Sequence, residues 1–119
     1  MRSHHDLDVW RKSIDIVTTI YEITKSFPNS EQYGLTNQIR RSAVSIPSNI
    51  AEGAGRNSLK EFIYFLSVTL GSIAELETQL IIANNLNFIK DKTLNDVLEE
   101  LISIRKMTLG LKKSIDKKI

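Results

Sequence analysis

The side chains best suited to bind a charged ligand are the adjacent arginines Arg40 and Arg41, with Arg56 further along the chain. A guanidinium group carries forked N–H donors that match the oxygens of a phosphate, so these arginines could bind a phosphorylated ligand. They could instead form ion pairs with carboxylates such as Glu52 and Glu77. Glu77 falls on the inward arc of its predicted helix, where an unpaired charge is strongly destabilising. We therefore favour the ion pair and expect Arg40 or Arg41 to be the partner of Glu77.

The other residues that could do chemistry do not form a recognisable catalytic or metal site. His4 and His5 are adjacent, but the chain has no cysteine and no spaced carboxylate cluster to complete a metal site with them. No histidine follows His5, and the sequence contains neither a Gly-x-Ser-x-Gly motif nor a glycine-rich phosphate loop. Glu75 and Glu77 point to different faces of a helix, which argues against an acid–base pair. We expect no catalytic, cofactor-binding or metal-binding residue, and a protein that is not an enzyme.

The composition is that of one globular domain over residues 1–119. Hydrophobic residues make up 41% of the chain and charged residues 25%, and a chain of 119 residues can bury one core. The absence of cysteine fits a reducing compartment, so we expect a cytoplasmic protein. The first eight residues lack the apolar core of a signal peptide, and no stretch approaches the ~18 uncharged apolar residues of a membrane span. We expect neither secretion nor contact with a membrane.

Basic residues are concentrated at the end of the chain. The net charge is +2, yet the segment 105–119 holds six basic residues against one acidic residue, Asp116. Such a cluster could contact the phosphates of a nucleic acid. Alternatively, the lysines complement the dipole of the last helical turn and keep the protein soluble. The candidate nucleic-acid contacts are Arg56, Arg105, Lys106, Lys112, Lys113, Lys117 and Lys118.

The spacing of apolar residues predicts helices over residues of about 7–26, 30–55, 58–84 and 91–116. Asn29 or Ser30, after Pro28, can cap the second helix. Ser58 and Glu61 have the spacing of a capping box, which marks the start of the third. Because the connections are short, consecutive helices should run in opposite directions. We predict an all-α, antiparallel up-down four-helix bundle.

The first predicted helix carries apolar residues on two neighbouring rows. One row consists of Leu7, Trp10, Ile14, Val17 and Tyr21, and the other of Val9, Ile16, Ile20, Ile23 and Phe27. Together the rows cover close to half of the helix circumference. Neighbouring helices of the same bundle could cover both rows, or one row could face the bundle and the other a second subunit. Both alternatives remain open.

The second predicted helix combines an apolar stripe with a polar one. Leu35, Ile39, Ala43, Ile46 and Ile50 share one face, and the polar stripe holds Gln38, Arg41, Ser45, Ser48 or Asn49, Glu52 and Arg56. Pro47 lies inside this helix and removes a hydrogen bond to the carbonyl of Ala43, so we predict a kink, with Ser45 and Ser48 as nearby replacement donors.

Several motifs resemble a known family, the small four-helix-bundle proteins encoded by intervening sequences of bacterial 23S ribosomal RNA genes. The segment 6–12 (DLDVWRK) resembles the opening motif of the family, and the segment 27–35 (FPNSEQYGL) resembles its first turn. The run 38–53 (QIRRSAVSIPSNIAEG), followed by Arg56, resembles its signature, and the segment 71–80 (GSIAELETQL) its third helix. The motifs extend from residue 6 to about residue 88, with Ser42 where alanine is usual and Ala54 where an aromatic residue is common.

This resemblance implies a four-helix bundle that assembles into a pentameric, barrel-like ring. A related branch is the accessory protein of diversity-generating retroelements, which partners a reverse transcriptase and binds nucleic acid through a basic surface. With that assembly in view, Arg41, Ser45, Asn49 and Glu52 could satisfy one another across a subunit boundary. We therefore assign Arg40, Arg41, Ser45, Asn49, Glu52 and Glu77 to an oligomer interface or buried polar network.

Two functions follow from these observations. The first is a non-enzymatic homo-oligomer, a pentamer, that binds RNA, DNA or a nucleic-acid enzyme through its basic surface. The alternative is a structural scaffold or protein-interaction module with no nucleic-acid role. Salt dependence separates them, because binding driven by phosphate contacts weakens steeply as the salt concentration rises.

Overall fold

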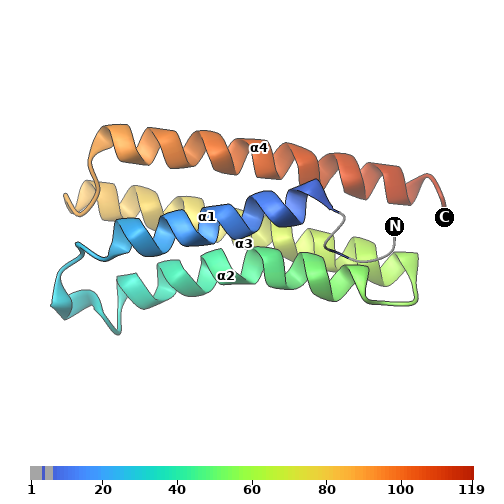
Figure 1. The fold of residues 1–119 in the computed structure, drawn as a ribbon, viewed down its shortest axis with the longest axis horizontal. Helices are drawn as coiled ribbons and strands as arrows, with labels where there is room; N and C mark the ends of the chain where they lie inside the picture. Colours follow the sequence, from blue (N-terminus) through green and yellow to red (C-terminus); the bar gives the residue numbers. More distant parts are fainter. Residues whose placement is uncertain (1–3, 5–6) are drawn as a thin grey trace.

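The structure is a computed structural model that describes residue 4 and residues 7–119. The elements of this part of the chain are α1 (Asp8–Thr24), the short 3-10 helix η2 (Asn29–Glu31), α2 (Leu35–Ala54), α3 (Leu59–Asn85) and α4 (Asp91–Asp116). Figure 1 shows the long helices side by side along the longest axis, with the chain reversing direction at each connection. The described residues thus have the predicted fold class, an all-α helical bundle.

Each long helix packs against two others, in the cyclic order α1, α2, α3, α4. The core runs along the middle of the bundle, and the apolar stripe predicted for α2 contributes three fully buried isoleucines to it. Full burial of an Ile or Leu side chain stabilises the fold by about 1.5–3 kcal/mol. The largest fully buried apolar side chains are Ile20, Ile39, Ile46, Ile50, Leu66, Ile73, Leu76, Leu80, Leu101 and Ile104.

One described helix, α3, could cross a membrane by length and composition alone. It contains an 18-residue window with a mean hydropathy of 1.3 and at most two charged residues. The core helix of a soluble protein passes the same test, and α3 packs against both α2 and α4. Only 33% of the window is buried, however. Helix α3 therefore carries part of its apolar composition on its outer face.

The helix α2 begins later than the sequence predicted. A 3-10 turn occupies residues 29–31, and α2 begins at Leu35 rather than near residue 30. The carboxylate of Glu31 accepts a hydrogen bond of 3.1 Å from the backbone N–H of Leu35, so it caps the helix in place of Asn29 or Ser30. A Cβ on Gly34 would lie 2.9 Å from that carboxylate oxygen. A side chain at position 34 would therefore require this oxygen, at the end of the flexible Glu31 side chain, to shift.

Pro47 lies inside α2 and is buried, and the helix continues through it from Leu35 to Ala54. The hydroxyl of Ser45 donates to the carbonyl of Ser42, at 2.7 Å, rather than to that of Ala43. It therefore does not replace the hydrogen bond that the proline removes. The kink at Pro47 stays a prediction.

The ends of α3 are fixed by polar side chains. Oγ of Ser58 accepts a hydrogen bond of 3.3 Å from the backbone N–H of Glu61, as the capping motif predicts. At the other end, the side-chain amide of Asn84 donates to the carbonyl of Ile89 and to the carboxylate of Asp91, both at 2.9 Å. These two bonds close the link from α3 to α4.

Candidate functional site

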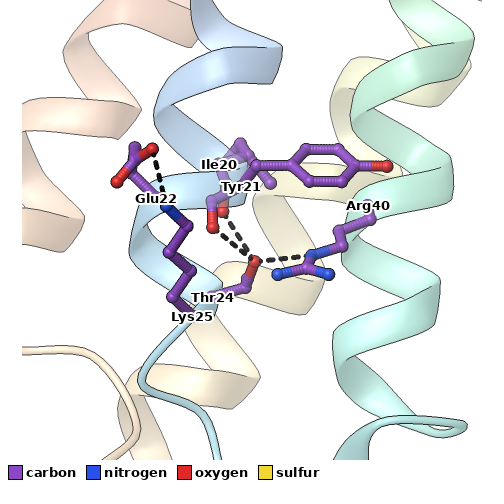
Figure 2. A network of polar contacts seen from close by, with 6 residues as sticks. All are labelled: Ile20, Tyr21, Glu22, Thr24, Lys25 and Arg40. Atoms are coloured by element: carbon purple, nitrogen blue, oxygen red, sulfur yellow. Dashed lines mark hydrogen bonds and ion pairs between the residues drawn. The ribbon is translucent and has the colours of Figure 1, made fainter.

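A polar network joins the last turn of α1 to the second turn of α2 (Figure 2). Nε of Arg40 donates a hydrogen bond of 2.8 Å to Oγ1 of Thr24. The Thr24 hydroxyl in turn donates to the carbonyl oxygens of Ile20 and Tyr21, at 2.8 and 3.3 Å. The guanidinium carbon of Arg40 also lies 4.5 Å from the centroid of the Tyr21 ring. Two contacts from α1, a hydrogen bond and a cation–π contact, therefore hold Arg40 in place.

Thr24 is the part of this network that the sequence analysis missed. A threonine in a helix commonly donates its hydroxyl to the carbonyl four residues before it, and Thr24 does so. It is buried at the end of the apolar row that faces the core. The signal that could have found it is a polar residue interrupting the row of Ile16, Ile20 and Phe27, because a buried hydroxyl needs a partner.

The expected ion pair between Glu77 and Arg40 or Arg41 is wrong. Glu77 is exposed, and neither arginine forms an ion pair with the residues that the structure describes. Leu66 is fully buried but Leu70 is only half-buried. The inward face of α3 therefore ends between these two leucines, and Glu77 falls on its outer border, where a carboxylate needs no partner.

Arg40 and Arg41 line one shallow hollow on the face shared by α1 and α2. Its volume is about 510 Å³. Arg40 is half-buried and Arg41 is exposed. The remaining lining residues are Tyr21, Asn37, Val44 and Ser45. No acidic side chain lines this hollow, so its electrostatic character is cationic.

A second hollow on the same face is mostly apolar and has a volume of about 340 Å³. It is lined by His4, Trp10, Ile14, Val17, Thr18, Val44, Pro47, Ser48 and Ala51. Ile14 is 40% exposed, and Tyr21 and Val44 are each 39% exposed. The bundle therefore buries the Val9 row of α1 and leaves the Trp10 row partly uncovered. Leu7, Trp10 and Val17 of that row still pack against the core, so a contact of its exposed part with a second subunit stays a prediction.

The polar stripe of α2 finds many of its partners within α2 or just after its end. The hydroxyl of Ser45 donates to the carbonyl of Ser42, and the side-chain amide of Asn49 donates to the carbonyl of Ser45, both at 2.7 Å. Glu52 forms an ion pair with Arg56, one helical turn later. Bonding of this stripe across a subunit boundary stays a prediction.

Arg56, one of the candidate nucleic-acid contacts, is engaged by its own chain. Besides its pair with Glu52, its guanidinium lies 3.8 Å from a carboxylate oxygen of Glu61. Its guanidinium carbon also lies 4.9 Å from the centroid of the Phe65 ring. Two nearby carboxylates offset its charge, so Arg56 is a weaker phosphate ligand than an unpaired cation would be.

The basic residues of α4 and the chain end are available to an outside partner. Lys112 is half-buried and the other five, Arg105, Lys106, Lys113, Lys117 and Lys118, are exposed. None of them forms an ion pair with the part of the chain that the structure describes. Figure 1 places the C-terminus of α4 at the end of the bundle where α3 begins, which adds Lys60 to this basic end.

The described residues hold no group of three or more His, Cys, Asp or Glu side chains that could bind a metal ion. The ring of His4 packs edge-on against that of Trp10, with 4.9 Å between the centroids. Its sequence neighbour His5 lies outside the described residues.

Comparison with known proteins identifies the family. The family model for the 23S rRNA-intervening sequence protein matches residues 5–110, and the chain belongs to this family. The motif resemblance is thereby confirmed. The chain is also similar to the crystal structure of a protein with unknown function from the S23 ribosomal protein family of Bacteroides thetaiotaomicron. The two share 25% identity with a TM-score of 0.82, over 88% of this chain and 95% of that one. No curated protein matches the chain.

Proposed function

We propose that this protein is a non-enzymatic, cytoplasmic homo-oligomer, a pentameric ring, that binds nucleic acid or a nucleic-acid enzyme through its basic end. The observation that carries the assembly is the partly uncovered Trp10 row of α1. Ile14 of that row borders the apolar hollow and exposes about two fifths of its surface. Contact with a second copy would remove this apolar surface from water, which is favourable.

A second uncovered surface supports a ring rather than a two-fold dimer. We define the outer ridge of α3 as Tyr64, Ser67, Gly71, Ala74, Thr78 and Ile82, all exposed and spaced three or four residues apart. Helices α1 and α3 are diagonal in the bundle and do not contact each other, so the outer face of α3 lies away from the face shared by α1 and α2. When two unlike surfaces of one chain meet, association is head-to-tail, and it gives a ring if the rotation between copies closes and an open filament if it does not. The number five rests on the family resemblance.

The nucleic-acid role rests on the unpaired charges at the basic end. The family match ends at residue 110, so Lys112, Lys113, Lys117 and Lys118 lie beyond it. A helix C-terminus attracts lysines for its own stability, so charge alone does not distinguish a phosphate surface from a solvated one. The second candidate is therefore a scaffold or protein-interaction module without a nucleic-acid ligand.

Assembly is tested by placing an arginine on the ridge. An added Cβ at Gly71 or at Gly110 would have no atom within 4 Å, so the same substitution can be compared on α3 and on α4. Light scattering should give the mass of several chains for wild type and Gly110→Arg, and a mass near 13.5 kDa for Gly71→Arg. Circular dichroism shows that each variant is folded. An unchanged mass of the folded Gly71→Arg variant would exclude the ridge from assembly.

Nucleic-acid binding is tested with single-stranded RNA at several salt concentrations. Each phosphate contact contributes a slope of about −0.7 to log K against log salt, so loss of two contacts should reduce the slope by about 1.4. Lys117→Gln with Lys118→Gln removes two cations of the basic end. The control, Lys90→Gln with Lys92→Gln at the start of α4, also removes two cations, one of which is paired with Asp96. Absence of RNA and DNA binding at low salt would leave the scaffold as the function.

A further inference from the structure

The side chain of Arg40 lines two neighbouring surface hollows, so a ligand from solution can reach it. The first hollow is the cationic one of about 510 Å³ that contains Arg41. The second, of about 260 Å³, lies beside the turn that follows α1 and is lined by Thr24, Lys25, Phe27, Pro28, Asn29, Gln32, Thr36 and Arg40. We call Arg40, Arg41 and the polar residues of these two hollows the Arg40 site.

The guanidinium of Arg40 is held in one orientation before any ligand binds. Its Nε is bonded to Thr24, and the Tyr21 ring lies against its face. Among the described residues, the two terminal nitrogens, Nη1 and Nη2, form no hydrogen bond or ion pair. These nitrogens form the forked edge that binds two oxygens of one anion. Because the side chain is already ordered, binding at this edge costs little further side-chain entropy.

The charges around the Arg40 site favour an anion with two negative charges. Lys25 is offset by Glu22, whose carboxylate lies 3.1 Å away. Glu31 keeps its charge, and its carboxylate accepts a hydrogen bond from Leu35 rather than from either arginine. Arg40 and Arg41 are left with no carboxylate partner among the residues described. A phosphate group matches both their charge and their forked donors.

A buried hydroxyl lies beside Arg40 in the second hollow. Thr36 is only 7% exposed, lines the second hollow, and its Oγ1 has no hydrogen-bond partner. An unpaired buried hydroxyl is unfavourable, and such groups commonly bond to water or to a ligand. The exposed amide of Asn37 in the first hollow offers further N–H donors.

We propose that the Arg40 site binds a phosphate group, with Arg40 as the oriented fork and Arg41 as the second positive charge. Thr24 and Tyr21 are positioning residues that hold the fork. The site goes beyond the proposed function, because it lies where α1 ends and α2 begins, at the opposite end of the bundle from the basic end of α4. Its ligand is either a free phosphate or a phosphate of RNA.

The first experiment is a titration with inorganic phosphate followed by NMR of the backbone amides. Wild type should show saturable shifts near Asn37 and Arg41. Arg40→Gln should bind about tenfold more weakly, since it loses a charged, forked donor, whereas Arg105→Gln on α4 should bind as wild type does. Arg40→Lys, which keeps the charge but loses the fork, should bind with an affinity between those of wild type and Arg40→Gln, and the amide spectrum of each variant without phosphate shows whether it is folded.

Thr24→Val tests the positioning role, because it retains every charge and nearly the shape of the side chain. We expect its phosphate affinity to fall several-fold and the NMR signal of the Arg40 Nε–H to shift, with the helical circular dichroism unchanged. A merely structural role for Thr24 would alter the free energy of unfolding and leave phosphate affinity as in wild type.

Paired RNAs of one sequence, with a 5′-phosphate or a 5′-hydroxyl, distinguish the sources. A preference for the 5′-phosphate that disappears in Arg40→Gln would assign the site to a terminal phosphate. If both RNAs bind equally and both bind Arg40→Gln more weakly, the site binds a phosphate of the RNA backbone. If the protein binds inorganic phosphate but neither RNA, the ligand is a free phosphate. The proposal is overturned if wild type does not bind phosphate, or if Arg40→Gln binds it as wild type does.

Discussion

The contact between α2 and α3 near Gly53 gives a stability prediction whose sign can be worked out. Gly53 is buried in the last turn of α2. A Cβ there would lie 2.8 Å from Cβ of Phe65 and 3.0 Å from Cδ1 of Phe62. The Cβ of Phe65 is attached directly to the backbone of α3, so it cannot rotate away. Gly53→Ala therefore requires the two helices to move apart.

Two opposing effects set the magnitude. Overpacking of a core costs about 1–3 kcal/mol. Alanine in a helix is favoured over glycine by roughly 0.5–1 kcal/mol, which offsets part of that cost. We expect Gly53→Ala to lower the free energy of unfolding by about 1–2 kcal/mol, since overpacking is the larger effect. A destabilisation of this size corresponds to a melting temperature lower by about 4–8 °C in a chain of this length.

Gly110→Ala is the matched control. Gly110 is an exposed position inside α4, and its added Cβ would contact nothing within 4 Å. Only the helix preference applies there, so this variant should be more stable than wild type by roughly 0.5–1 kcal/mol. Urea denaturation followed by circular dichroism, at one protein concentration, measures both variants. A Gly53→Ala variant as stable as Gly110→Ala would refute the close approach of α2 and α3.

Three further substitutions test single interactions by the same urea denaturation. Thr36→Val should raise the free energy of unfolding by about 1 kcal/mol, because it removes a buried hydroxyl without a partner; a loss of stability would mean that this hydroxyl is bonded. Ser58→Ala should lower the free energy of unfolding by about 1 kcal/mol, because the cap of α3 is lost. Ser58→Asp should retain most of this stability, because aspartate can also cap a helix. Asn84→Ala should lower the free energy of unfolding by about 1–3 kcal/mol, since two hydrogen bonds are lost. An unchanged stability would show that the α3–α4 link holds without Asn84.

The helices were the part of the fold that the sequence predicted best. The predicted range 58–84 agrees with α3 (Leu59–Asn85) to within one residue at each end, and the predicted range 91–116 coincides with α4 (Asp91–Asp116). These boundaries depend on caps and breakers within a few residues, such as Ser58. The start of α2 was predicted about five residues too early, because a side chain from the preceding turn, Glu31, caps this helix.

The candidate site was harder to predict, because its contacts join residues far apart in the chain. Arg40 was recognised as a possible phosphate ligand, but its partner Thr24 lies 16 residues earlier on another helix. The pairing with Glu77 was wrong because periodicity gives the direction of a side chain only approximately. A small rotation of α3 places that carboxylate in water instead of in the core.

The sequence by itself determined the helical elements, the apolar stripe of α2, the family and the accumulation of basic residues after position 104. Each of these depends on local spacing or on motifs, which require no knowledge of distant contacts. Only the tertiary structure decided which row of α1 is buried, since that depends on how α2 and α4 pack against it. The same packing leaves the Trp10 row partly uncovered and brings Arg40 against Thr24 and Tyr21.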